Sequence, residues 1–230
     1  MHQKQESVVA FIDVVGWEKA FGTVGHEGLL KIAMEISSYK LTFSASRKNE
    51  ISEFLLNSKS PPLENYFDIN FSFFSDSFII SAPVNSAKAM FGVAKMACMQ
   101  LLVSHGFLVR GGVSVGYFTH DTSNDIYLGV PLNQAAHIEK CTKMPRIQLH
   151  ENTLYLKDTQ SLNELVYYDG SCFVINIANR SEAWLAEAMS QIKKSLSLNL
   201  TEVQMEKWIY LNDHLPKMHQ EAKAAFQSCK

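Results

Sequence analysis

Residues 8–17 read VVAFIDVVGW, an apolar run that a single carboxylate, Asp13, interrupts near its end. Apolar residues at consecutive positions are typical of a central strand that is covered on both faces. We therefore expect a strand over 7–15 in the middle of a sheet. A carboxylate beside so much hydrocarbon is costly unless a cation or hydrogen-bond donors compensate it.

A second stretch repeats this arrangement. Residues 71–80 read FSFFSDSFII, which predicts two strands, near 67–74 and 78–83, joined tightly at Ser75 and Asp76. Taken singly, Asp13 and Asp76 are more simply explained as turn residues. If the strands lie side by side, however, the two carboxylates form a site for hard divalent ions, which prefer oxygen ligands. Such a site favours metal-assisted phosphoryl or nucleotidyl transfer.

The remaining pattern predicts an α+β fold. Strand and helix order through residue 177 is close to βαββαβ, a ferredoxin-like sandwich with an antiparallel-rich sheet and helices on one face. We expect a domain over 1–178 and a helical extension over 179–230 packed on it, with an irregular connection over 47–65. The other expected elements are helices over about 27–46, 85–104 and 131–140, strands over 107–117, 146–150, 165–168 and 172–177, and only helices after 179.

Composition excludes several classes of protein. The formal net charge of −2 gives no general attraction to nucleic acid or to anionic lipid. Four cysteines without CxxC spacing argue against a zinc site and a disulfide scaffold. The polar first residues lack the apolar core of a signal peptide, and no apolar run approaches the roughly 20 residues that span a bilayer. We expect a soluble protein of a reducing cytoplasm.

Two further sets of polar residues are candidates for a site. Arg110 lies in an apolar strand and needs a carboxylate or phosphate partner, so a structural ion pair and a ligand contact are about equally good explanations. Gly16 could let backbone N–H groups face an anion. Asn133 and His137 are four residues apart, hence on one helix face, where an ordinary polar surface is the simpler explanation.

Four segments, in order, resemble the catalytic domains of class III nucleotide cyclases. The family motifs are F-x-D-x-x-G-[FW], [FIS]-[GS]-D-[GS], R-x-G-[IV]-x-x-G and G-x-x-x-N-x-A-x-R-x-E. Their counterparts are 11–17 (FIDVVGW), 74–77 (FSDS), 109–116 (VRGGVSVG) and 127–139 (YLGVPLNQAAHIE), which together cover about 8–150. No motif is strong alone, but the ordered set is fairly specific. Within the superfamily, the chain looks most like the compact bacterial pyrimidine cyclases of the Pycsar anti-phage systems.

The resemblance implies an activity and a set of roles. The chain would convert UTP or CTP to cUMP or cCMP and pyrophosphate, and the product would activate a separate effector. Asp13 and Asp76, with the Val14 carbonyl, would hold two Mg²⁺ or Mn²⁺ ions. Arg110 would contact the triphosphate, which is also cradled by the backbone amides of three successive residues. These are Val15, Gly16 and Trp17.

The family builds its sites across a head-to-tail homodimer, so Asn133 of one subunit would orient the ribose bound by the other. Two departures from the family pattern matter. The adenine-reading lysine and its aspartate partner correspond to Ser72 and Ile126, which argues against adenine. The helix arginine that steadies the transition state corresponds to His137, which is shorter and only partly charged at neutral pH. Another cation such as Lys140 or Lys143 would fill the arginine's role, or the role would stay unfilled.

Two alternatives stay open. The first is an adenylyl or guanylyl cyclase with atypical base contacts. The second is a catalytically silent, cyclase-like domain that binds a nucleotide, for which His137 is the best support. The metal aspartates Asp13 and Asp76 oppose the silent domain, because such a domain has no need to bear their desolvation cost.

Overall fold

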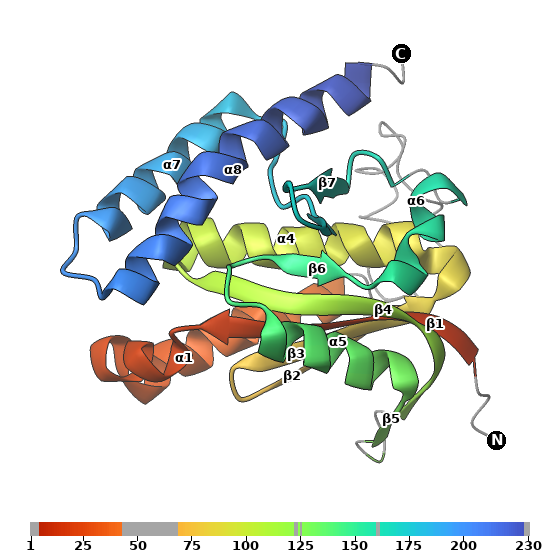
Figure 1. Ribbon diagram of the computed structural model, residues 1–230. Helices are drawn as coiled ribbons and strands as arrows, with labels where there is room; N and C mark the ends of the chain where they lie inside the picture. The colour runs from red at the N-terminus through yellow and green to blue at the C-terminus, as the bar shows by residue number, and fades with distance from the viewer. Residues whose placement is uncertain (1–4, 43–68, 122–123, 125, 160–161, 228–230) are drawn as a thin grey trace.

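The computed structural model describes residues 5–42, 69–121, 124, 126–159 and 162–227 (Figure 1). The connection expected over 47–65 lies outside these residues.

The strands form one sheet in the order β2-β3-β1-β4-β6-β8-β7, with β5 paired to β4. The strands are β1 (Gln5–Val15), β2 (Asn70–Phe74), β3 (Ser77–Pro83), β4 (Leu108–Asp121), β5 (Ile126–Gly129), β6 (Ile147–Leu149), β7 (Val166–Tyr168) and β8 (Phe173–Ile175). The helices are α1 (Trp17–Thr42), α4 (Ala87–His105), α5 (Val130–Cys141), α6 (Tyr155–Thr159), α7 (Glu182–Leu196) and α8 (Glu202–Gln227), with short 3₁₀ turns at Val84–Ser86 and Glu151–Thr153.

The predicted α+β fold class is confirmed. All strand pairs are antiparallel except β4 with β6, which are parallel. The strand that begins the chain, β1, lies between β3 and β4 as expected for its continuous apolar run. In this register Asp13 is opposite Ser77 on one side and Arg110 on the other.

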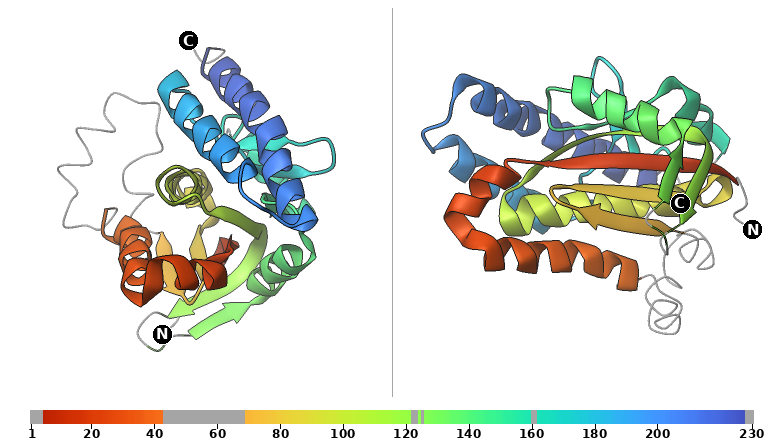
Figure 2. Two further views of the ribbon diagram at one scale, coloured as in Figure 1. Left: turned by 90° about the vertical axis from the view of Figure 1, so that its left-hand side faces the viewer. Right: turned by 90° about the horizontal axis from the view of Figure 1, so that it is seen from below.

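The expectation of helices on one face of the sheet holds for α1 and α4 but not for α5. Val8, Ala10 and Ile12 of β1 join one buried core with residues of α1 and α4. On the opposite face, α5 packs against β4 at Gly112, where a Cβ atom would lie 2.4 Å from the Ala135 carbonyl oxygen. A helix can approach this closely only because glycine has no side chain there. Helices therefore cover both faces (Figure 2).

The first helix begins earlier than expected. It starts at Trp17, about ten residues before the predicted start near 27, and Gly25, with φ 68°, interrupts it. Phe21 and Val24 are 53% and 47% exposed, so this turn carries no buried stripe that the sequence pattern could reveal. In contrast, Gly106 ends α4 in the left-handed conformation, close to the predicted helix end near 104.

The C-terminal region is helical, as predicted. Ser181 caps α7 by accepting a hydrogen bond from the Trp184 N–H, and Thr201 and Gln204 form a capping box before α8. Both helices pack onto the main core, and α7 lies against α4 on the side away from the sheet (Figure 1). The helical segment Val84–His105 is long and apolar enough to cross a membrane, but 61% of its most apolar window is buried in this core.

Candidate active site

The two aspartates singled out in the sequence lie next to each other at the end of the sheet. The Ser77 hydroxyl donates to Asp13 Oδ1 at 3.5 Å and lies 3.4 Å from Asp76 Oδ1. The Val14 N–H also donates to the Asp76 carbonyl oxygen at 2.8 Å. Asp76 sits in a two-residue hairpin turn in which Ser75 has φ 57°, a conformation typical of tight hairpins. Strand pairing and this turn therefore bring together two carboxylates that are far apart in the sequence.

Arg110 completes the group through an ion pair on each side. Its Nε lies 3.0 Å from Asp13 Oδ2, across the β1–β4 pair, and 2.7 Å from Glu139 Oε1 on α5. The arginine thus has the carboxylate partner that its apolar strand required. Glu139 received no role from the sequence, although it follows His137 by two positions in the helix motif. Only the packing of α5 on β4 reveals that it faces Arg110.

Electrostatics at this site reflect an excess of acidic groups. Burial raises the pKa of Asp13; the Arg110 guanidinium opposes the rise and the Asp76 carboxylate adds to it. Burial likewise raises the pKa of Glu139, again opposed by Arg110 and reinforced by Asp13. Asp13 and Glu139 thus share one guanidinium and are both repelled by the Asp76 carboxylate, so a further cation would relieve this repulsion.

The donor set fits a hard divalent cation. Asp13 and Asp76 offer carboxylate oxygens on either side of one hydroxyl, and both are only partly exposed. Such oxygens are the ligands that Mg²⁺ and Mn²⁺ favour. Within the described part of the chain, no cluster of three or more histidine, cysteine or acidic residues is arranged to hold a metal. Further ligands would therefore come from the backbone, water or a substrate, as is usual for Mg²⁺.

The residues after Asp13 form the start of α1. Gly16 has φ 89°, and the Ala20 N–H donates to its carbonyl at 3.0 Å, which closes the first helical turn. The first N–H groups of a helix have no partner within the helix. The N–H groups near Trp17 lie close in sequence to Asp13, so they are available to donate hydrogen bonds to an anion bound beside it. Val14 is 1% exposed and its side chain belongs to the main core, so the side chain could not reach a ligand.

Ser72 lies in a polar cluster with residues that the sequence did not point to. Its hydroxyl accepts from the Tyr127 hydroxyl at 2.9 Å and lies 3.2 Å from His120 Nε2, while His120 Nδ1 lies 2.9 Å from Ser81 Oγ. Ile126 is 47% exposed and pairs with Asp121 instead. Successive strand residues point to opposite faces, so Tyr127 occupies the position by Ser72 that was expected for Ile126.

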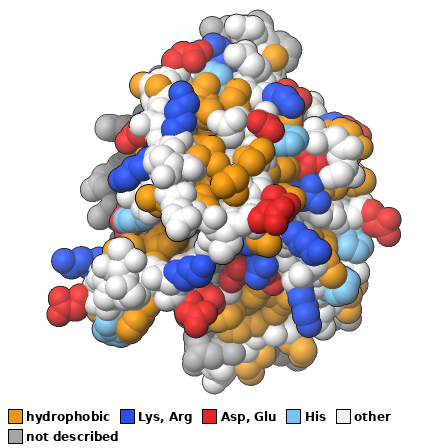
Figure 3. Space-filling view, turned by 60° about the vertical axis from the view of Figure 1, so that its left-hand side comes forward, with side chains coloured by type: hydrophobic (Ala, Val, Ile, Leu, Met, Phe, Trp, Pro, Cys, Tyr) orange, Lys and Arg blue, Asp and Glu red, His pale blue; other side chains and the backbone are white. Residues whose placement is uncertain are grey.

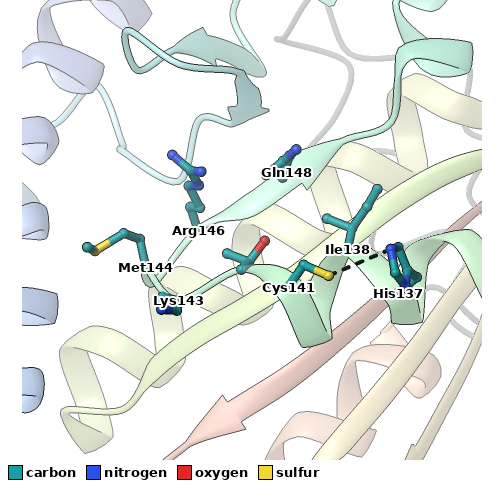
Figure 4. Close-up of a pocket in the computed structure, with 8 residues that line it drawn as sticks. His137, Ile138, Cys141, Lys143, Met144, Arg146 and Gln148 are labelled. Atoms are coloured by element: carbon teal, nitrogen blue, oxygen red, sulfur yellow. Dashed lines mark hydrogen bonds between the residues drawn. The ribbon is translucent and has the colours of Figure 1, made fainter.

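Asn133 and His137 lie on α5 but do not join the aspartates of the same chain. Both are exposed, and Cys141 Sγ lies 3.6 Å from His137 Nε2. His137 borders a cavity of about 430 Å³ at the end of α5, with Arg146 and Gln148 on its other side (Figure 4). Lys143 also lines this cavity, whereas Lys140 is exposed elsewhere on the helix. Among the described contacts, neither residue therefore has one with Asp13 or Asp76 of its own chain.

Among known proteins, the chain is similar to solved structures of nucleotide cyclases at low sequence identity. No family model matches the chain, and no curated protein matches it. Two structures of a bacterial light-regulated adenylyl cyclase align with TM-scores of 0.47 and 0.48, at 14% identity over 67% of this chain. The chain spans 46% of the length of those two. The catalytic core of a rhodopsin-guanylyl cyclase with converted specificity, in complex with ATPalphaS, aligns at 0.46 and 13% identity, over 75% of this chain and 96% of that one. Similarities this low assign neither family nor activity.

Proposed function

We propose that this chain is a metal-dependent nucleotide cyclase of the class III type, acting on a pyrimidine nucleoside triphosphate. The observation that carries the proposal is the convergence of Asp13 and Asp76 on the Ser77 hydroxyl, beside Arg110. The ordered motifs that resemble class III cyclases assign metal binding to this same pair, which supports the proposal. The product would be cUMP or cCMP, a cytoplasmic second messenger for a separate effector in anti-phage defence.

Each group at the site has a role in this reaction. Asp13, Asp76 and the Val14 carbonyl would hold two Mn²⁺ or Mg²⁺ ions, which when bound supply charge neutralisation and a more acidic ribose hydroxyl. The 3′ oxygen attacks the α-phosphorus, and the bond to the β-phosphate breaks. Arg110 and the N–H groups of Val15, Gly16 and Trp17 would hold the phosphate oxygens during this displacement.

A second copy of the chain would complete each site. Asn133 and His137 are exposed on α5, so they are available to a partner subunit rather than to their own aspartates. Four apolar side chains near this helix are also exposed, which supports a contact between copies. They are Tyr117 (59%), Ile126 (47%), Leu128 (70%) and Val130 (65%).

The polar cluster around Ser72 supports a substrate other than ATP. The described contacts of Ser72 are with a hydroxyl and an imidazole, and no lysine is among them. A hydroxyl can donate or accept, so Tyr127 and Ser72 would suit the carbonyl and N–H edge of a pyrimidine. An adenylyl or guanylyl cyclase remains the first alternative, and competition among the four nucleoside triphosphates distinguishes it.

The proposal is tested by mass spectrometry of the products that form from an equimolar mixture of the four nucleoside triphosphates with Mn²⁺. We expect cUMP or cCMP to dominate, and Asp13→Asn and Asp76→Asn to abolish it. Asp213→Asn, which changes an exposed acid on α8, is the matched control. If no cyclic product forms from any substrate while the protein is dimeric by light scattering, the cyclase proposal fails. Nucleotide binding without product would then favour the silent domain.

Mixing two inactive variants tests the shared sites. In a dimer of one Asp13→Asn subunit and one Asn133→Ala subunit, one site carries both changes and the other carries neither. Random reassociation of a head-to-tail dimer should restore roughly a quarter of the wild-type activity. Activity that stays at the level of the separate variants would contradict sites built from two subunits.

A further inference from the structure

The start of α8 is fixed beside the sheet by a buried ion pair. Asp169, in the turn between β7 and β8, has a side chain that is 1% exposed. It accepts hydrogen bonds from the Tyr210 hydroxyl at 2.7 Å and from Arg146 Nη1 at 2.5 Å. Trp208, on the adjacent side of α8, is buried in the main core at 8% exposure. The first turns of α8 therefore have one defined position relative to the sheet.

This anchor lies one strand away from Arg110. The Arg146 carbonyl accepts a hydrogen bond from the Gly111 N–H at 3.0 Å, and β6 pairs with β4 at this point. Gly111 directly follows Arg110 in β4. Lys207 precedes Tyr210 by one helical turn, so it belongs to the part of α8 that reaches this end of the sheet. Figure 1 shows the start of α8 at the end of the sheet where β1 runs into α1.

The charges around Lys207 are those of the candidate active site. Lys207 is half-buried, and burial lowers its pKa; the Arg110 charge also lowers it, the Asp13 charge raises it, and Lys19 lowers it. Lys19 belongs to the first turn of α1. Figure 3, which brings this end of the molecule forward, shows basic and acidic side chains interspersed on the surface there. Lys207 is thus within electrostatic reach of charged residues from three other elements, namely Asp13 of β1, Lys19 of α1 and Arg110 of β4.

We propose that Lys207 is a phosphate-binding residue of this site and that it contacts the β- and γ-phosphate oxygens of the bound nucleoside triphosphate. The inference rests on the proposed function, and it makes the C-terminal helices part of the substrate site. Metal ions held by the carboxylates would contact one side of the triphosphate, and the Lys207 ammonium would contact the opposite side. A lysine ammonium acts as a point charge on phosphate, so it needs no fixed geometry from the helix.

Binding of inorganic tripolyphosphate with Mn²⁺, measured by calorimetry on the full chain, tests this role without any turnover. We expect Lys207→Gln to weaken binding about tenfold, as for one lost charge-assisted contact, and Lys207→Arg to retain most of it. Lys217→Gln is the matched control, because it removes an exposed lysine about 15 Å further along the same helix. Lys207→Gln should leave affinity for the cyclic monophosphate unchanged, because that product has no β- or γ-phosphate.

The outcomes separate this inference from the cyclase proposal. The role of Lys207 would be overturned if Lys207→Gln, like Lys217→Gln, bound tripolyphosphate with an affinity within twofold of wild type. This holds even if the enzyme makes a cyclic nucleotide. Equal weakening of tripolyphosphate and cyclic monophosphate binding would also overturn it, because it would indicate a structural role. Lysine-dependent tripolyphosphate binding without any cyclic product would leave the inference standing and end the cyclase proposal.

Discussion

Replacing Asp169 with asparagine should destabilise the protein strongly, because it removes the charge that holds α8 to the β7–β8 turn. Besides Tyr210 and Arg146, the carboxylate accepts from the Ser171 N–H at 2.9 Å, the Ser171 hydroxyl at 2.8 Å and the Cys172 N–H at 3.1 Å. Asparagine keeps one acceptor oxygen but presents an NH₂ group to donors. It would also leave the Arg146 guanidinium, whose side chain is 19% exposed, without a counter-ion.

The size of the effect follows from these contacts. Removing one partner of a buried ion pair costs about 3–5 kcal/mol, and partial exposure of Arg146 places Asp169→Asn near the lower end, about 3–4 kcal/mol. For a domain of this size that loss lowers the melting temperature by about 6–16 °C. Urea unfolding and calorimetry at pH 7.5 measure both quantities. Asp213→Asn should change stability by less than about 0.5 kcal/mol.

The pH dependence provides a second readout. Burial alone would raise the pKa of Asp169, but hydrogen bonds from Tyr210 and from the Cys172 and Ser171 N–H groups hold that pKa well below its usual range. The wild-type stabilisation is therefore fully present above the unfolded-state pKa of about 3.9 and declines as the pH falls below it. The difference in unfolding free energy between wild type and Asp169→Asn should become smaller from pH 5 to pH 3. A gap below 1 kcal/mol at pH 7.5, or one that does not change with pH, would refute the reasoning.

Three further changes test the site and its support. Asp13→Asn should lower cyclase turnover by about a thousandfold or more without lowering the melting temperature, since it relieves carboxylate repulsion; a large loss of stability would point to a structural role. Gly112→Ala should cost about 1–3 kcal/mol in urea unfolding because its Cβ meets the Ala135 carbonyl at 2.4 Å, whereas Gly22→Ala, with nothing within 4 Å, should not destabilise. Tyr127→Phe should shift the preference among nucleoside triphosphates about tenfold in a competition assay, and an unchanged preference would remove Tyr127 from base recognition.

The sequence predicted most of the central sheet because that signal is local. Continuous apolar runs identified β1 and the β2–β3 hairpin, and their order placed Asp13 near Asp76. Gly106 and the capping box at Thr201 define helix ends through their own backbone chemistry. Such features depend on a few neighbouring residues, so they can be read without knowledge of the fold.

What the sequence could not supply depends on contacts between distant elements. Glu139 faces Arg110 only because Gly112 lets α5 approach β4 closely. Ile126 was assigned by its position in a motif, whereas the pairing of β5 with β4 decides which side chain faces Ser72. Lys207 carried no local signal, since a lysine on a helix is usually a solvated surface residue.

The bridge that Arg110 makes between Asp13 and Glu139 has a consequence for ion uptake. The guanidinium already neutralises part of the Asp13 charge, so the divalent ion of the proposed function would exchange with a resident counter-ion instead of approaching a bare carboxylate. Glu139 gives the displaced guanidinium a second anchor 2.7 Å away, which keeps it from drifting into solvent. If the site binds a metal as proposed, the Arg110 guanidinium released from Asp13 would stay beside Glu139, where it could contact a phosphate group of the substrate.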